Sequence, residues 1–184
     1  MPTRINIGGA ITPPEDARIP VLDHGFLYGD SVYESFRTYR QRPILFERNF
    51  ARLRKAAVSI GLALPFDEPT LLDEVIRTIN ATGNDGESLV RIIVTRGVGD
   101  MTPDPASCST PGSVIIVLPL AAPGEHLYRD GIGVIFSKLK RDTHIASIKT
   151  GNLIHQVLGA QEAHAGGAEE AIFLTADGRV SDGT

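Results

Sequence analysis

Residues 31–40 read SVYESFRTYR, and their side chains alternate between two sets. The first set is Val32, Glu34, Phe36 and Thr38, and the second is Tyr33, Ser35, Arg37 and Tyr39. Because successive side chains of a β-strand point to opposite faces of a sheet, this alternation predicts a strand with one set on each face. Residues 41–43 then predict a turn, after which the chain returns.

Helical and strand patterns surround this stretch. Apolar residues recur at spacings of three and four in residues 47–60 and 67–81, which predicts two amphipathic helices, with Gly61 as a stop signal after the first. Further strands are predicted in residues 4–11, 88–97 and 113–120.

A linker is predicted where the sequence reads PLAAPG, so the chain divides into residues 1–119, a linker at 120–124, and residues 125–184. The third part is predicted to contain a strand at 133–138, a helix ending near Ala165, a strand at 170–175 and a hairpin turn into VSDGT. Because this last strand has hardly begun at Thr184, we expect more chain to belong to the protein.

Composition narrows the class of protein. The chain has 184 residues, 42% of them hydrophobic and 22% charged, which is typical of a globular protein. A net charge of −4 argues against a nucleic-acid partner, and no apolar run reaches the ~18 residues of a membrane span. The single cysteine, Cys108, cannot form an internal disulfide, so we expect a reducing, cytoplasmic setting. The stretch MPTRINIGGA lacks the apolar segment of a signal peptide, so we expect none.

Lys149 lies in the stretch SIKTGNL, residues 147–153, just before a helical pattern. It is interpreted either as a solvated charge or as a nucleophile that forms a Schiff base with a carbonyl group. The second role needs a lysine held by burial or by nearby cations. No dinucleotide, Walker A, nucleophile-elbow or zinc-protease motif occurs, and the five histidines, interpreted as surface or interface residues, show no metal-ligand spacing.

Four arginines and one aspartate are further candidates. Arg91 has apolar neighbours and Arg37 shares a face with two tyrosines, so each is interpreted as part of an internal ion pair or as a ligand for an anion. Arg96, at the end of the same strand as Arg91, is expected to be more exposed. Arg52 lies at the edge of the first helix's apolar face, which favours a solvated charge. Asp182 is either a turn acid or the partner of a pyridinium nitrogen.

Four blocks, in order, resemble the fold-type IV (class IV) aminotransferases, which use pyridoxal 5′-phosphate (PLP). The blocks are LDHGFLYGDSVYESFRTY (22–39), LFERNFARLRKAA (45–57), LVRIIVTRG (89–97) and SIKTGNLIHQVLGAQEAHAGGAEEAIFLTADGRVSDGT (147–184). The resemblance implies an α+β fold of two domains. Residues 1–119 would form a small N-terminal α/β domain, and residues 125–184 the first part of a larger, pseudo-barrel-like PLP-binding domain.

The resemblance also implies residue roles. Lys149 is similar to the lysine that binds PLP covalently and then moves a proton, and Arg52 to the arginine that holds the cofactor phosphate. Asp182 stands where the family usually has a glutamate facing the pyridine nitrogen. The candidate substrate-binding residues are Tyr33, Arg37, Arg91 and Arg96.

The implied activity is exchange of an amino group between an amino acid and a 2-oxo acid such as 2-oxoglutarate, by a homodimer. LVRIIVTRG and Arg37 favour branched-chain substrates, whereas the block around Lys149 looks more like D-amino acid enzymes. The alternative is an aminodeoxychorismate lyase, which eliminates pyruvate to give 4-aminobenzoate. A PLP-binding protein without activity is a third hypothesis, suggested by Asp182 and the early end of the chain.

Overall fold

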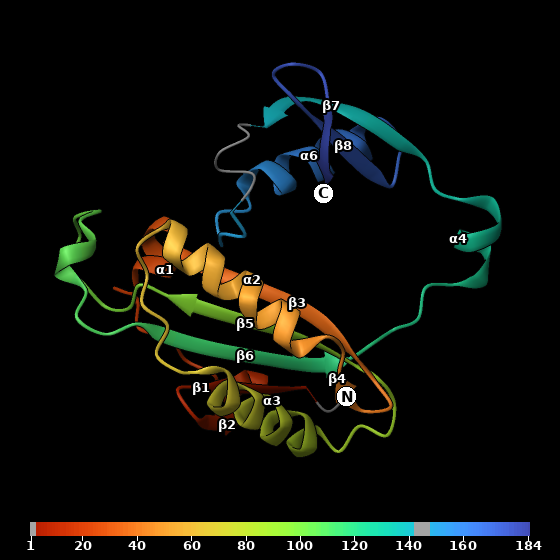
Figure 1. Cartoon of the computed structure of the whole chain (residues 1–184). Coiled ribbons are helices and arrows are strands. Elements are labelled where there is room, and N and C mark those ends of the chain that lie inside the picture. Colours follow the sequence, from red (N-terminus) through yellow and green to blue (C-terminus); the bar gives the residue numbers. More distant parts are fainter. Residues whose placement is uncertain (1–2, 142–147) are drawn as a thin grey trace. The chain divides into compact units, whose positions relative to one another are not determined.

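The computed structural model describes residues 3–141 and 148–184, so His144 and Ser147 of the sequence predictions lie outside the described residues. The chain forms two compact units (Figure 1), Met1–Leu120 with Lys149–Gly151, and Ala121–Ile148 with Asn152–Thr184. The division falls beside the linker predicted at 120–124. The candidate lysine and the two residues after it are therefore grouped with the first unit, although they follow the linker in sequence.

A six-stranded antiparallel sheet forms the base of the first unit. Its strands are β1 (Arg4–Ile7), β2 (Ala10–Thr12), β3 (Ser31–Tyr39), β4 (Arg42–Pro43), β5 (Ser88–Thr95) and β6 (Gly112–Pro119). They lie in the order β2-β1-β6-β5-β3-β4. The strands predicted from the alternation and from the β-branched segments are confirmed.

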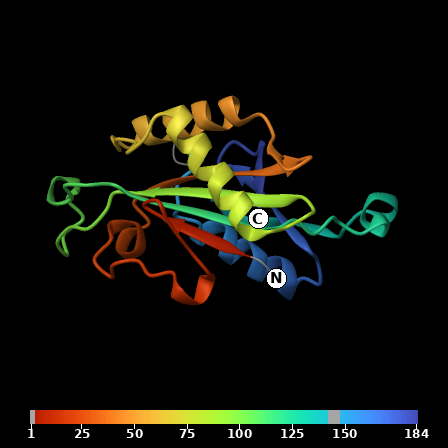
Figure 2. The same cartoon turned by 90° about the horizontal axis from the view of Figure 1, so that it is seen from below.

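Helices cover one face of this sheet (Figure 2). They are α2 (Phe46–Ser59) and α3 (Glu68–Thr82). The unit also contains the short helix α1 (His24–Tyr28) and the 3₁₀ turns η1 (Pro14–Asp16) and η2 (Pro105–Ser107). Helix α2 packs on β3, and α3 on β1 and β6. The Asp67 carboxylate accepts a hydrogen bond from the Thr70 amide at the start of α3, and Gly83 ends the helix in the left-handed conformation. Both predicted helices are confirmed.

Strand β3 has one covered face and one open face. Val32, Glu34, Phe36 and Thr38 are all buried on the side of the helices. Tyr33 and Ser35 are half-buried on the other side, where Arg37 and Tyr39 are exposed. The predicted alternation is confirmed, and it places a carboxylate, Glu34, within an otherwise mostly apolar core.

The second unit is built on three strands. These are β7 (Val134–Arg141), β8 (Glu170–Thr175) and β9 (Val180–Gly183), accompanied by α4 (Glu125–Asp130) and α6 (Ile154–Ala165). Strands β7 and β8 are parallel, and α6, which packs on both, belongs to the crossover that such a pair requires. Strand β9 returns antiparallel to β8, as the predicted hairpin requires. Across residues 3–141 and 148–184, the helices are too short or too polar to cross a membrane.

Candidate active site

Lys149 is attached through its backbone to the free edge of β3. The Tyr33 amide donates to the Lys149 carbonyl oxygen at 3.0 Å, and the Gly151 amide donates to the Ser31 carbonyl oxygen at 2.9 Å. Val32 and Thr150 form the antiparallel bridge between these two bonds. A side chain at Gly151 would collide with the Ser31 hydroxyl, so glycine permits the close approach. The lysine backbone is therefore held as if it were a short extra strand.

The lysine side chain lies over an aromatic ring on the open face of β3. Lys149 Nζ is 4.4 Å from the centroid of the Tyr33 ring, and the guanidinium carbon of Arg91 is 5.1 Å from the same centroid. Both distances are typical of cation–π contacts. Within the described part of the chain, neither cation has a carboxylate within ion-pairing distance. Two cations around one tyrosine form a surface that attracts an anionic group.

Strand β5 is largely buried, but the Arg91 side chain is exposed and is not enclosed by the strand's apolar residues. Arg91 pairs in register with Ser35 of β3, and both side chains lie on the open face, where Arg91 Nε donates to the Ser35 hydroxyl at 3.1 Å. Arg37 lies on the same open face, with Nε donating to the Thr38 carbonyl oxygen at 3.2 Å. Neither arginine forms the internal ion pair that was the alternative interpretation, so far as the described residues show.

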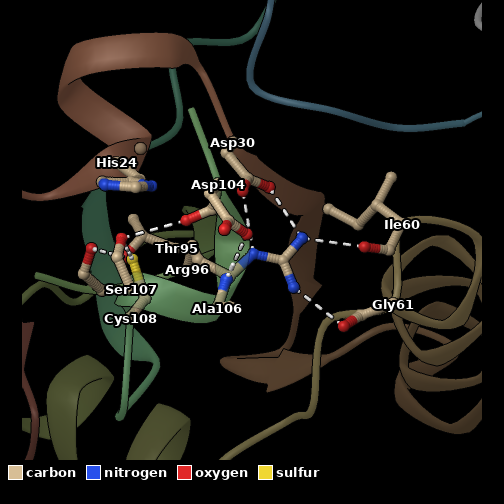
Figure 3. A network of polar contacts seen from close by, with 12 residues as sticks. His24, Asp30, Ile60, Gly61, Thr95, Arg96, Asp104, Ala106, Ser107 and Cys108 are labelled. Carbon is tan, nitrogen blue, oxygen red and sulfur yellow. Dashed lines mark hydrogen bonds and ion pairs between the residues drawn. The ribbon is translucent and has the colours of Figure 1, made fainter. Parts of the chain in front are cut away.

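Arg96, expected to be the more exposed arginine, is instead the more buried one (Figure 3). Its side chain is 11% exposed and forms a forked pair with Asp30, with Nε to Oδ2 at 2.8 Å and Nη2 to Oδ1 at 3.0 Å. It also donates to the carbonyl oxygens of Ile60 and Gly61, each at 2.8 Å, at the C-terminal end of α2. Four of its five N–H groups are thus used within the first unit. Its assignment as a substrate ligand remains a prediction.

Arg52 is not an isolated solvated charge. Its Nε donates to Glu34 Oε2 at 2.5 Å and its Nη2 to Glu34 Oε1 at 2.8 Å. The Glu34 side chain is 1% exposed and that of Arg52 is 57% exposed, so the pair connects the core to the surface. The hydrogen bond to Glu34 raises the pKa of Arg52 above its usual value. Asn49, one turn earlier on α2, accepts a further bond from Nη2 at 3.2 Å.

In the second unit, Asp182 on β9 faces Arg141 at the end of β7. Arg141 Nε lies 3.3 Å from Asp182 Oδ1, an ion-pair distance, and the guanidinium carbon is 5.8 Å from the centroid of the Phe173 ring. Arg141 Nε and Asp182 Oδ1 are both buried, and neither has a well-formed hydrogen bond in the described structure. The Asp182 side chain is 36% exposed, so its second oxygen, Oδ2, can accept a hydrogen bond from another group. Sequence reasoning missed Arg141, because nothing in VIFSKLKR distinguishes it from its basic neighbours.

A lysine amine, arginine N–H groups and a carboxylate are the groups with which proteins bind PLP and tune its ring nitrogen. The chain belongs to the class IV aminotransferase family, whose cofactor is PLP. The family model for class IV amino-transferases matches residues 31–184.

Three curated proteins illustrate the relationship. The chain is 32% identical to a putative branched-chain-amino-acid aminotransferase of Methanocaldococcus jannaschii, over 98% of this chain and 62% of that protein. It is 28% identical to a D-alanine aminotransferase of Bacillus licheniformis, over 98% of this chain and 62% of the other. It is 26% identical to an aminodeoxychorismate lyase of Bacillus subtilis, over 97% of this chain and 61% of the other.

The fold matches solved structures of the same family. A branched-chain amino acid aminotransferase of a T.th. strain, solved with pyridoxamine 5′-phosphate, superposes with a TM-score of 0.89 at 26% identity, over 98% of this chain and 62% of that one. The predicted α+β class IV fold is therefore confirmed for the part covered. The chain spans about three-fifths of the length of the relatives it matches.

The residues present fit the family's cofactor, as far as each unit shows by itself. In the second unit, Asp182 Oδ1 is buried beside Arg141 Nε, but the side chain as a whole is 36% exposed, so its other oxygen is the one that could accept a hydrogen bond from a protonated pyridine nitrogen. In the first unit, Lys149 has no carboxylate partner among the described residues. The two N–H groups on Arg52 Nη1 likewise have no hydrogen-bond acceptor there, because Glu34 and Asn49 accept only from Nε and Nη2. These are the groups that bind a carbonyl and a phosphate.

Proposed function

We propose that the protein is a PLP-dependent aminotransferase that exchanges an amino group between an amino acid and a 2-oxo acid such as 2-oxoglutarate. One observation carries the proposal: Lys149 is held by strand pairing beside Tyr33 and Arg91, in a chain of the class IV family. A fixed amine beside an anion-attracting surface is what a reaction of amino acids with an aldehyde cofactor requires.

Lys149, Arg52 and Asp182 are the proposed cofactor-binding residues. PLP, when bound, supplies the electron sink that lets a proton leave the amino acid's α-carbon. Lys149 Nζ, held at the β3 edge, would bind the cofactor and then carry that proton. The free Nη1 edge of Arg52 would bind the phosphate, and the Asp182 carboxylate would keep the ring nitrogen protonated.

The proposed substrate side is the open face of β3 and β5. Arg91 and Arg37 would attract carboxylate groups, and Tyr33 would pack against the substrate. Ile93, which pairs with Tyr33 in register, adds aliphatic surface to the same face. A face with cations beside an aliphatic side chain favours a branched-chain amino acid as substrate. We propose that Arg96 acts indirectly, because its contacts fix the ends of β3, β5 and α2, the elements that carry the other proposed residues.

The alternative is an aminodeoxychorismate lyase, favoured by the similarity to the Bacillus subtilis protein. The two activities differ in product, because a transaminase forms a new amino acid whereas the lyase releases pyruvate and 4-aminobenzoate.

We further propose a domain division in which residues 1–119 form a small N-terminal domain and residues 125–184 form the first part of the PLP-binding domain. A cytoplasmic homodimer completes the proposal, and sedimentation of the intact protein would test the dimer.

The test is a product assay on the intact protein with PLP. L- and D-forms of branched-chain amino acids and of alanine are each supplied with 2-oxoglutarate, and aminodeoxychorismate is supplied alone. Glutamate formed from an L-branched-chain substrate is the expected result. Lys149→Ala should abolish it, whereas Lys55→Ala, at an exposed lysine of α2, should not. Equal turnover by wild type and Lys149→Ala would reject the proposal, and formation of 4-aminobenzoate alone would replace it with the lyase.

A further inference from the structure

We propose that Glu34, assisted by Asn49, is a positioning residue that fixes the Arg52 guanidinium so that only its Nη1 edge is presented to the cofactor phosphate. The inference rests on the proposed function, which takes that phosphate as the anion bound by Arg52. It concerns a buried carboxylate that the proposed chemistry does not otherwise use.

Glu34 is buried on the covered face of β3, between Val32 and Phe36 in the strand. An ionised carboxylate is unfavourable in such a place unless its oxygens accept hydrogen bonds. Both oxygens do: Oε2 accepts from Arg52 Nε, and Oε1 accepts from Arg52 Nη2 and, at 2.8 Å, from the Ser35 amide. The carboxylate therefore has one defined orientation, fixed by the strand backbone.

The donors of Arg52 can be counted. A guanidinium has five N–H groups, two on each Nη and one on Nε. Glu34 takes the Nε group and one Nη2 group, and Asn49 Oδ1 takes the other Nη2 group. Asn49 is itself fixed, because its Nδ2 donates to the Ile44 carbonyl oxygen at 2.9 Å. The two Nη1 groups are left, on a side chain that is 57% exposed.

This arrangement prepares Arg52 for an anion before the anion arrives. A free arginine on a helix surface loses rotamer freedom when it binds a phosphate, which weakens binding. Here that freedom is already lost in the folded protein, through a forked pair whose planar geometry suits arginine and not lysine. Glu34 thus acts on the phosphate only through Arg52.

Electrostatics and positioning predict opposite results for Glu34→Gln. If Glu34 were merely a nearby negative charge, its removal would relieve repulsion and tighten phosphate binding. If it positions Arg52, an amide at this place cannot accept both N–H groups of the fork, and phosphate binding weakens. The direction of the change therefore separates the two roles.

The experiment compares the dissociation constants of PLP and of pyridoxal, which lacks the phosphate, for the intact protein freed of cofactor. The ratio of the pyridoxal constant to the PLP constant isolates the contribution of the phosphate. Glu34→Gln is expected to lower this ratio by about tenfold or more, the effect of one charge-assisted hydrogen bond, with pyridoxal binding unchanged. Arg52→Gln should lower it further, and Glu34→Gln should add nothing in that background. Arg54→Gln, at another exposed arginine of α2, should leave the ratio unchanged.

The possible failures are distinct. A ratio that stays the same or rises in Glu34→Gln, while it falls in Arg52→Gln, overturns the positioning role and leaves the proposed function standing. An unchanged ratio in Arg52→Gln overturns the phosphate assignment and this inference with it, and a wild-type protein that binds no PLP overturns the proposed function. If Glu34→Gln does not fold, Asn49→Ala replaces it. A smaller fall in the ratio is then expected, and a wild-type ratio overturns the inference.

Discussion

Replacing Arg96 by methionine is expected to lower the free energy of unfolding by about 3 kcal/mol, because it removes one partner of a largely buried ion pair. The arginine side chain is 11% exposed and that of Asp30 is 23% exposed. Methionine keeps much of the apolar stem, so lost packing is a small part of the effect. What remains is an unpaired Asp30 carboxylate and the carbonyl oxygens of Ile60 and Gly61 without their donor.

The figure of about 3 kcal/mol is the lower end of the range for breaking a buried pair, chosen because water reaches part of Asp30. In a chain of this length it corresponds to a fall in melting temperature of about 6–12 °C. Urea unfolding of the intact protein measures the free energy, provided the slope with denaturant is unchanged.

Arg91→Met is the matched control, since Arg91 lies within β5 on the exposed face and donates to a single hydroxyl group. Its effect should stay below about 1 kcal/mol. Asp30→Asn, combined with Arg96→Met, should recover part of the loss, because the unpaired charge is removed. If Arg96→Met destabilises no more than Arg91→Met, the structural role of Arg96 is refuted. A raised KM at full stability would instead support the substrate-binding role expected from the sequence.

Gly151→Ala is expected to lower kcat at least about tenfold, because its Cβ would collide with the Ser31 hydroxyl and shift the backbone beside the lysine. Wild-type steady-state kinetics would contradict this. Asp182→Asn should lower kcat, since an amide lacks the negative charge that we propose to face the ring nitrogen, whereas Asp182→Glu should keep most activity. The hydrogen bond from Asn6 lowers the pKa of Glu74 below 4.5, so its contribution to stability is present above that pH and is lost as pH falls through the lowered pKa. Urea midpoints at pH 7 and pH 4 should therefore differ less in Glu74→Gln, and an identical difference would contradict the linkage.

Much of the fold could be predicted because it depends on local periodicity. The alternation in residues 31–40 and the apolar stripes of the two long helices recur over enough residues to specify each element. The helices α1 and α4 were missed because five or six residues are too few to show a stripe. Helix α1 depends instead on the Asp23 cap and on Gly29 in the left-handed conformation.

The environment of the arginines was predicted less well. Arg91 has apolar neighbours in sequence, yet its side chain lies on the open face because a strand sends neighbours to opposite sides, so the alternation rule applied to residues 31–40 would also have indicated this exposure. Arg96 lies just beyond the strand, where exposure is the usual expectation, but Asp30 pairs with it across 66 positions of sequence. Glu34 with Arg52, and Arg141 with Asp182, are also paired through sheet register and packing. Such partners are visible only in three dimensions.

Strand β3 connects these observations, because it contributes to the proposed site through three separate features. Its edge binds the backbone of Lys149, its covered face carries Glu34, which holds Arg52, and its open face carries Tyr33. If β3 slipped by one residue relative to β5, the side chains on its two faces would change places. Glu34 would then leave Arg52, and Tyr33 would leave Lys149.

On the proposed function, the register of β3 matters for chemistry as well as for stability, and the Arg96 ion pair lies at the end of the β3–β5 ladder. Ser31 and Thr95 are the last paired residues of β3 and β5, and Asp30 and Arg96 directly adjoin them. The Arg96 amide donates to the Asp30 carbonyl oxygen at 3.0 Å, which extends the ladder by one bond, and the side-chain fork then closes it. A shifted register would separate this fork as well as exchange the faces. The ion pair is thus expected to disfavour a one-residue slip, which would move Tyr33 to the other face of the sheet. This is the kind of specificity role best documented for polar groups that fix register.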